Sequence, residues 1–198
     1  MKTLLRIDSS FNLNGSFSRL AADHFETLWK EQNPEANVLY RDLEKSALPH
    51  LSQSTYAAFG QSGDTESVQM SDELIEELEQ ADTILLSSPV YNFSVPSTLK
   101  AYIDHVIRIN RTFGYDPVNQ TRKGLLTEKT AAVIVARGGL PIEGKSPDGV
   151  EDYLTGILKF MGIDQVDTFS VYGTTNENAD KQLQDTKNKI SEFHKNLV

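Results

Sequence analysis

Short apolar runs alternate with amphipathic helical patterns along nearly the whole chain. Apolar residues at helical spacing predict helices at 18–32, after Ser71, at 97–109, at 150–161 and towards the end of the chain. The runs that we expect to form strands cover residues 3–8, 37–42, 83–88, 130–136 and 166–172. This alternation is typical of a parallel sheet with helices on both faces.

Five strands and five helices in this order predict an α/β fold of the flavodoxin-like type. We expect a doubly wound three-layer sandwich around a five-stranded parallel sheet with strand order 2-1-3-4-5. A length of 198 residues suits one domain with a full core, so a single domain over residues 1–198 is expected. Residues 43–69 fit less well and form either a mobile excursion over a site or one short helix. Ser71 is expected to cap the next helix.

Composition excludes several classes of function. The net charge of -9 argues against a nucleic-acid partner, because phosphate backbones require a basic face. With no cysteine there is no disulfide, thiolate nucleophile or iron–sulfur cluster, so redox chemistry would need a bound cofactor. No run approaches the roughly 18 apolar residues of a membrane helix, and no targeting segment is apparent, so we expect a cytoplasmic location without membrane contact. The four histidines lack metal-ligand spacing, and we expect no metal.

Three loops follow predicted strands and carry the residues of a candidate site. In parallel sheets, ligands bind beyond the carboxyl ends of the strands. After the first strand, the hydroxyls of Ser10, Ser16 and Ser18 and the start of a helix at Phe17 suit a phosphate monoester. The loop lacks the glycine pattern of dinucleotide-binding folds and the lysine of a P-loop, which favours a terminal phosphate. Taken alone, these residues could simply cap a helix.

The other two loops suit a flat ring, and with the phosphate loop they predict a flavin mononucleotide (FMN) site. One contains Pro89, Val90, Tyr91, Asn92 and Phe93, and it offers aromatic surface and backbone donors for the edge of the ring. The other contains Ala136, Arg137, Gly138 and Gly139. Its glycines permit close backbone approach, and its arginine would place a cation near the reduced ring. Core aromatics and an arginine in a surface ion pair are the simpler alternatives.

With these motifs in view, the chain resembles the FMN-dependent NADH-azoreductase and quinone reductase family. The resemblance spans nearly the whole length and includes Pro-x-Tyr-Asn-Phe at 89–93, Thr-Phe-x-Tyr at 112–115 and Arg-Gly-Gly at 137–139. It implies that the thirteen residues named in the three loops bind FMN. It also implies a homodimer with two sites at the subunit interface. Ala136 departs from the family, which often has serine there.

The expected activity is two-electron reduction of quinones and aromatic azo compounds by hydride transfer. NADH is the preferred donor, although the sequence does not separate it from NADPH, and one surface serving donor and acceptor in turn predicts ping-pong kinetics. Phe59, Phe113 and Tyr115 are candidates to bind substrate, and no side-chain acid or base is assigned. The alternative is a flavodoxin-like electron carrier without its own nicotinamide-dependent turnover.

Overall fold

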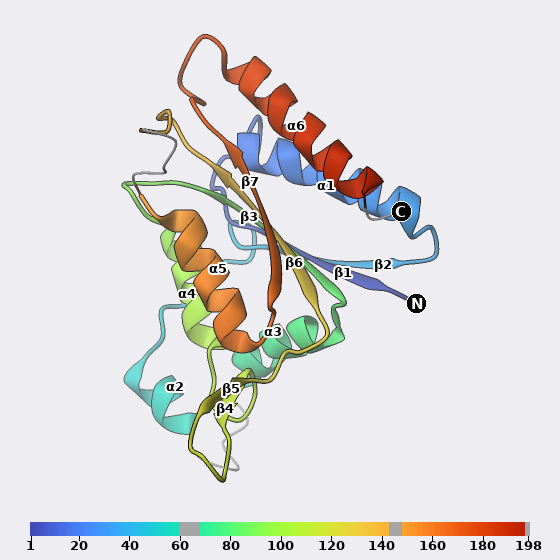
Figure 1. The fold of residues 1–198 in the computed structure, drawn as a ribbon. Helices are drawn as coiled ribbons and strands as arrows, with labels where there is room; N and C mark the ends of the chain where they lie inside the picture. The colour runs from blue at the N-terminus through green and yellow to red at the C-terminus, as the bar shows by residue number, and fades with distance from the viewer. Residues whose placement is uncertain (60–67, 143–147, 197–198) are drawn as a thin grey trace.

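A five-stranded, entirely parallel sheet forms the centre of the protein in the computed structural model, which describes residues 1–59, 68–142 and 148–196. The strands in spatial order are β2 (Asn37–Asp42), β1 (Thr3–Asp8), β3 (Thr83–Pro89), β6 (Thr130–Ala136) and β7 (Gln165–Val171). This order is the predicted 2-1-3-4-5 arrangement, so the flavodoxin-like fold is confirmed. All five strands run in one direction, and their carboxyl ends lie towards the left of Figure 1.

Helices cover both faces of the sheet (Figure 1). One layer consists of α1 (Phe17–Gln32) and α6 (Ala179–Lys195), and the other of α3 (Gln69–Gln80), α4 (Ser97–Val106) and α5 (Val150–Met161). Successive strand residues point to opposite faces of the sheet. Leu4 therefore packs towards α1 and α6, while Leu5 packs towards the other layer. Each such fully buried aliphatic side chain contributes about 1.5–3 kcal/mol to folding.

Several boundaries differ from those expected. The helix α3 begins at Gln69 with Val68 at its N-cap, so the prediction that Ser71 caps it is wrong. Ser71 is buried, and its hydroxyl donates to the carbonyl of His105 over 2.6 Å, tying α3 to α4. The helix α4 ends at Val106 rather than at Ile109, because the Thr112 hydroxyl donates a hydrogen bond of 2.7 Å to the Val106 carbonyl.

Two elements complete the fold. The short helix α2 (Gln53–Ala58) lies in the segment where one short helix was an open alternative. A two-stranded hairpin, β4 (Phe113–Tyr115) and β5 (Arg122–Gly124), was not anticipated. It packs tightly on the end of α5, where a Cβ on Gly124 would lie 2.2 Å from the Gly162 nitrogen. The segment 60–67, which belongs to the expected excursion at 43–69, and the segment 143–147 lie outside the described residues.

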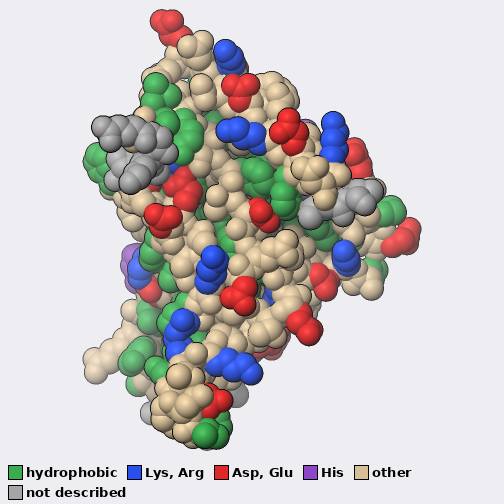
Figure 2. Space-filling view, viewed as in Figure 1, with side chains coloured by type: hydrophobic (Ala, Val, Ile, Leu, Met, Phe, Trp, Pro, Cys, Tyr) green, Lys and Arg blue, Asp and Glu red, His purple; other side chains and the backbone are tan. Residues whose placement is uncertain are grey.

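The charged surface is mixed rather than basic on the face drawn in Figure 2. Lysine and arginine side chains there are interspersed with aspartate and glutamate over α5, α6 and the hairpin. Such a face lacks the basic stripe that nucleic-acid backbones require. Within the described part of the chain, no helix is both long and apolar enough to cross a membrane.

Candidate functional site

The three loops meet in one hollow of about 270 Å³ at the carboxyl edge of the sheet, which we call the carboxyl-edge crevice. Pro89 pairs with Ala136 in adjacent strands, so the second and third loops leave the sheet at the same level. The amide of Val90 then donates to the Ala136 carbonyl over 2.8 Å, which joins these two loops. The lining residues are Ser10, Phe11, Asn12, Gly15, Ser16, Phe17, Pro89, Val90, Tyr91, Ala136, Gly138 and Thr174.

The helix α1 points an uncapped N-terminus at this crevice. Its N-cap residue is Ser16, yet among the described residues the Ser16 side chain accepts no hydrogen bond from the first turn. Instead, its Oγ lies 3.1 Å from Oγ of Ser18, which is completely buried. The first-turn N–H groups and the hydroxyls are therefore available to an anion, and the positive end of the helix favours one. The alternative in which Ser16 simply caps the helix with its side chain does not fit this geometry.

Glycine at position 15 shapes the entry into that helix. Gly15 has a φ of +79°, in the left-handed region where side chains are strained, and nothing lies within 4 Å of a Cβ placed on it. Conformation, rather than space, therefore requires glycine here. The turn brings Ser10 and Ser16 to the same crevice.

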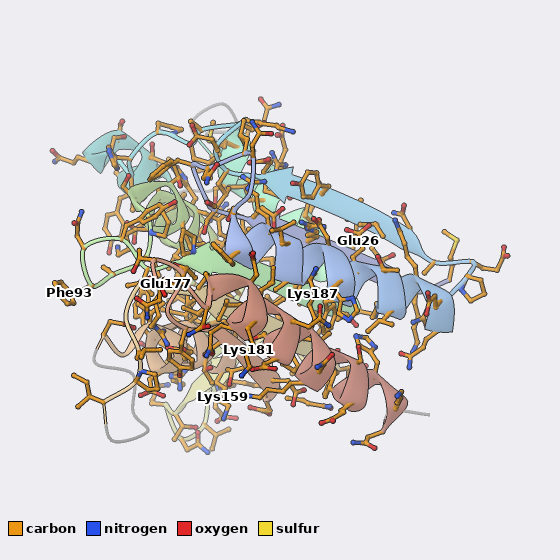
Figure 3. The ribbon with its side chains drawn as sticks, turned by 90° about the horizontal axis from the view of Figure 1, so that it is seen from above. Glu26, Phe93, Lys159, Glu177, Lys181 and Lys187 are labelled. Carbon is orange, nitrogen blue, oxygen red and sulfur yellow. The ribbon has the colours of Figure 1, made fainter. Side chains whose placement is uncertain are left out.

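The second loop turns sharply through two residues with left-handed backbone. Asn92 and Phe93 have φ values of +49° and +64°, and Tyr91 and Ser94 exchange backbone hydrogen bonds of 2.9 and 3.0 Å. This is the geometry of a two-residue turn with φ above zero at both positions, which is costly for phenylalanine. The Phe93 ring projects from the tip of the loop into solvent and is 79% exposed (Figure 3).

Aromatic side chains connect the crevice to a larger neighbouring hollow. Phe11 stacks on Tyr91 with ring centroids 4.5 Å apart, and the Tyr91 hydroxyl lies 3.2 Å from Oγ of Ser10. Phe11, Val90 and Tyr91 also line a hollow of about 810 Å³ that contains Asn92 and reaches the start of α4. The two hollows share this aromatic wall, so together they can receive a molecule with both a phosphate and a flat ring.

Arg137 does not line the crevice, because acidic residues before and within α5 hold its guanidinium. Its side chain forms ion pairs with Asp148, at 3.0 Å, and with Glu151, and it stacks on Tyr172. Burial lowers the pKa of Arg137, but the two carboxylates outweigh that effect and raise it overall. The Arg137 guanidinium is therefore engaged by two carboxylates in this structure, and its place near a bound ring stays a prediction. The alternative ion pair is present, although it is buried rather than at the surface.

A buried charge network supports the first loop from below. Arg19 donates to the Ser10 carbonyl over 2.7 Å and makes two bonds of 2.8 Å to the Asp42 carboxylate. Asp8, which is fully buried, accepts from the Ser87 hydroxyl at 2.6 Å and so links β1 to β3. Removing one member of such a buried pair typically costs about 3–5 kcal/mol. The network therefore fixes the backbone that presents Ser10.

The three candidate substrate residues lie away from the crevice of their own protomer. Phe59 covers Arg108 near the end of α4, with the guanidinium 4.6 Å from the ring centre. Phe113 packs edge-on against Phe160 at 4.9 Å, beside the last turn of α5, and Tyr115 lies next to Phe113. The end of α5 faces the amino edge of the sheet, so these rings cannot reach the crevice within one chain.

Sequence reasoning missed Phe11, Asn12 and Thr174 as lining residues. Thr174 follows β7, and the rule that loops after strands form the site could have found it. Phe11 follows β1 at the same distance, so the rule also applied to it, but its stacking on Tyr91 depends on how two distant loops approach one another. Of the expected set, Ser18, Phe93, Arg137 and Gly139 do not line the crevice, and Asn92 lines only the larger hollow.

Comparison with known proteins agrees with this geometry. The family model described as a flavodoxin-like fold matches residues 1–194. The chain belongs to this flavodoxin-like family. The flavodoxin-like chain is 42% identical over 177 residues to the FMN-dependent NADH:quinone oxidoreductase of Xanthobacter autotrophicus, and the alignment covers 84% of both proteins. It is 38% identical over 202 residues to the protein of the same name from Hydrogenovibrio crunogenus, covering 96% of this chain and 98% of that relative.

Solved structures support the same fold for this flavodoxin-like protein. The FMN-dependent NADH-azoreductase from Bacillus anthracis, solved in complex with FMN, superposes with a TM-score of 0.84 at 23% identity and covers 100% of this chain and 99% of its own. The azoreductase AzrA gives a TM-score of 0.86 at 22% identity, covering 97% of this chain and 98% of its own. At these identities the likeness establishes the fold, and the site rests on the residues described above.

Proposed function

We propose that this protein is an FMN-dependent NADH:quinone oxidoreductase that also reduces aromatic azo compounds. The observation that carries the proposal is the uncapped start of α1 facing a crevice with Ser10, Ser16 and the Tyr91 loop. That arrangement suits a phosphate at one end and a flat ring at the other. Relatives about 40% identical over most of the chain carry this activity in their names.

In this proposal, the residues divide between the two ends of FMN. The first-turn amides at Phe17 and Ser18 and the hydroxyls of Ser10 and Ser16 hold the phosphate. Val90, Tyr91 and Asn92 lie along the ring, with Pro89, Phe93 and residues 136–139 completing its surroundings. FMN held there would supply the hydride-transfer chemistry between the nicotinamide and the acceptor. The protein binds and orients the reactants, and no side chain is assigned as an acid or base.

A homodimer with shared sites is part of the proposal. Apolar side chains that are exposed in one chain gather in the loops at the carboxyl edge, where Phe11, Phe93, Leu140 and Ile142 are 53–79% exposed. Isolated surface apolar residues are ordinary, but a group around a site marks an interface. Because Phe113 and Tyr115 lie far from their own crevice, they can contact substrate only at a partner's site.

Steady-state kinetics of the FMN-loaded protein tests the proposed activity. Initial rates with varied NADH and a benzoquinone should give parallel lines in double-reciprocal plots, because both reactants use the same flavin surface in turn. NADPH in place of NADH should give a lower kcat/KM. Failure to reduce any quinone or azo dye with either nicotinamide would contradict the proposal and favour a simple electron carrier.

A further inference from the structure

A second hollow opens at the opposite edge of the sheet, between α1, α6 and the amino ends of the strands. It has a volume of about 460 Å³ and shares no lining residue with the carboxyl-edge crevice. Its floor includes Thr83, Thr130 and Gln165, which are the first residues of β3, β6 and β7. In Figure 1 this edge lies at the right, where α1 and α6 approach both termini, and Figure 3 shows these helices side by side. We call it the amino-edge hollow.

Aromatic rings form the wall of the amino-edge hollow. Phe25 and Trp29 come from α1, and Phe193 and His194 come from α6. The Phe25 ring meets the His194 ring edge-on at 4.6 Å, and Phe193 meets His194 at 5.5 Å. Ala132 on β6 presents only a methyl group between these helices, which leaves the space open. Volume and lining are those of a small-molecule site rather than of a packing defect.

The hydrogen bonds of Gln32 determine which nitrogen of the buried His194 ring carries the proton. The Gln32 amide nitrogen donates to the His194 carbonyl over 2.6 Å, so the Gln32 amide oxygen faces Nδ1 of His194 at 2.9 Å. An amide oxygen only accepts, and Nδ1 must therefore carry the proton. Nε2 is then a bare acceptor. It is buried and has no hydrogen-bond partner among the described residues, although His194 is only 3% exposed.

A second acceptor lines the same space. Asp167 lies two residues before Phe169 on β7 and therefore faces α1 and α6. Within the described part of the chain its carboxylate makes no hydrogen bond or ion pair, and burial raises its pKa. Leaving a buried acceptor such as Nε2 of His194 unpaired is unfavourable. A ligand that donates hydrogen bonds would satisfy the groups that the protein leaves open.

We propose that the amino-edge hollow binds a flat aromatic compound with a hydrogen-bond donor on the ring, of the phenol or aromatic amine class. Phe25, Trp29 and His194 are only 2–5% exposed, so the ligand would have to part α1 from α6 before its ring packs among the aromatic side chains and its donor bonds Nε2 of His194. Asp167 would accept from a second donor or from an amine. The site is independent of the flavin and does not rest on the function proposed above.

Trp29 provides a direct readout, because it is the only tryptophan in the chain. In a ¹H–¹⁵N spectrum of the FMN-loaded protein, its indole N–H gives a single side-chain peak. Titration with phenol should move this peak saturably. Anisole, in which a methyl group replaces the donated hydrogen, should bind about threefold to tenfold more weakly, as expected for the loss of one hydrogen bond. No movement of the peak with phenol, or equal affinity for the two compounds, would overturn the proposal.

Two matched histidine variants locate the contact. His194→Phe keeps a ring in the wall but removes the acceptor, so the preference for phenol over anisole should disappear. His24→Phe is the control, because His24 also joins α1 to α6, through Ser191 at 2.8 Å, but does not line the hollow. It should keep the preference. Unchanged visible absorbance of bound flavin shows that each variant is folded. A preference that survives in His194→Phe would contradict the assignment.

Discussion

At the scale of single residues, the proposed phosphate site depends on the start of α1. A serine at an N-cap ordinarily accepts from the first turn, and substituting it costs helix stability. Here the hydroxyl of Ser16 turns to Ser18 instead, and the amides remain free. The two hydroxyls therefore serve a ligand more than they serve the helix. Affinity for FMN and stability of the protein should respond differently when they are removed.

Replacing Ser16 and Ser18 together by alanine should weaken FMN binding by about 1–3 kcal/mol, because the Ser16 hydroxyl that donates to the phosphate and the Ser18 hydroxyl that holds it in place are both lost. The melting temperature of the FMN-free protein should change little. Equilibrium dialysis against FMN measures the affinity, and Ser54→Ala, which removes an exposed hydroxyl on α2 away from the crevice, is the control. An unchanged dissociation constant for the double variant would rule out the role in phosphate binding.

Phe93 is a residue whose conformation is costly and whose ring is 79% exposed. A left-handed backbone costs a residue with a side chain about 1–2 kcal/mol, and glycine escapes this cost. Phe93→Gly should therefore leave the melting temperature unchanged or raise it. It should also lower kcat/KM for a quinone about tenfold if the ring covers bound substrate. Asn92→Gly relieves the same turn without removing the Phe93 ring, so it should change the melting temperature in the same direction. A lower melting temperature for Phe93→Gly would contradict the claim that the backbone of Phe93 is strained.

At the scale of elements, α1 and α6 meet through two histidines. Burial is the main cause that lowers the pKa of both His24 and His194, and Lys187 lowers that of His24 further. The folded protein therefore favours the neutral rings. As pH falls below about 6.5, the unfolded chain binds protons that the folded chain does not, and stability falls with it. Carboxylates with lowered pKa values, such as Glu26 and Glu151, change the pH dependence of stability only at lower pH, where they become protonated.

Urea denaturation of the protein at pH 7.5 and at pH 5.5 tests this linkage. The midpoint should be lower at pH 5.5, and the difference should shrink in His194→Gln, which removes one of the two titrating groups. Lys45→Gln, on an exposed side chain outside this interface, should keep the full difference. A midpoint that is equal or higher at pH 5.5 in the unmodified protein would contradict the expected loss of stability at low pH.

Elements governed by periodic apolar patterns were predictable from the sequence, and those governed by distant contacts were not. The buried runs of β3 and β6 and the Gly162 end of α5 follow from local rules, and Gly162 indeed caps α5 at a φ of +104°. The hairpin could not be predicted, because its three-residue strands depend on Gly124 packing against Gly162.

In the candidate site, the predicted strand ends located the three loops. The ion pairs of Arg137 were not predictable, because its partners lie 11 and 14 residues away in the sequence.

At the scale of the whole molecule, the proposed homodimer would build each complete site from the crevice of one chain and the β4–β5 hairpin of the other. Tyr115 is 55% exposed at one edge of the protomer, while the crevice is at the other. In the proposed dimer, each crevice would therefore take its substrate-binding rings from the partner. Defects in the crevice and in the hairpin should complement one another when they are on different chains.

Mixing two impaired variants tests this arrangement. Tyr115→Ala should lower kcat/KM about tenfold, and the Ser16 and Ser18 double variant should lose FMN at limiting flavin. After subunit exchange, a mixed dimer has one site with an intact crevice and an intact hairpin, so activity should exceed the average of the two variants. Activity that equals this average would contradict sharing of sites between chains.

Anaerobic titration of the FMN-loaded protein with NADH tests the central claim, that the carboxyl-edge crevice holds a flavin that a nicotinamide reduces in place. We expect FMN-free protein to take up one FMN per chain. The visible absorbance should then bleach rapidly with one NADH per flavin and without a persistent one-electron radical, and a quinone should restore the colour. Failure to take up FMN, or slow reduction through a lasting radical, would contradict the account.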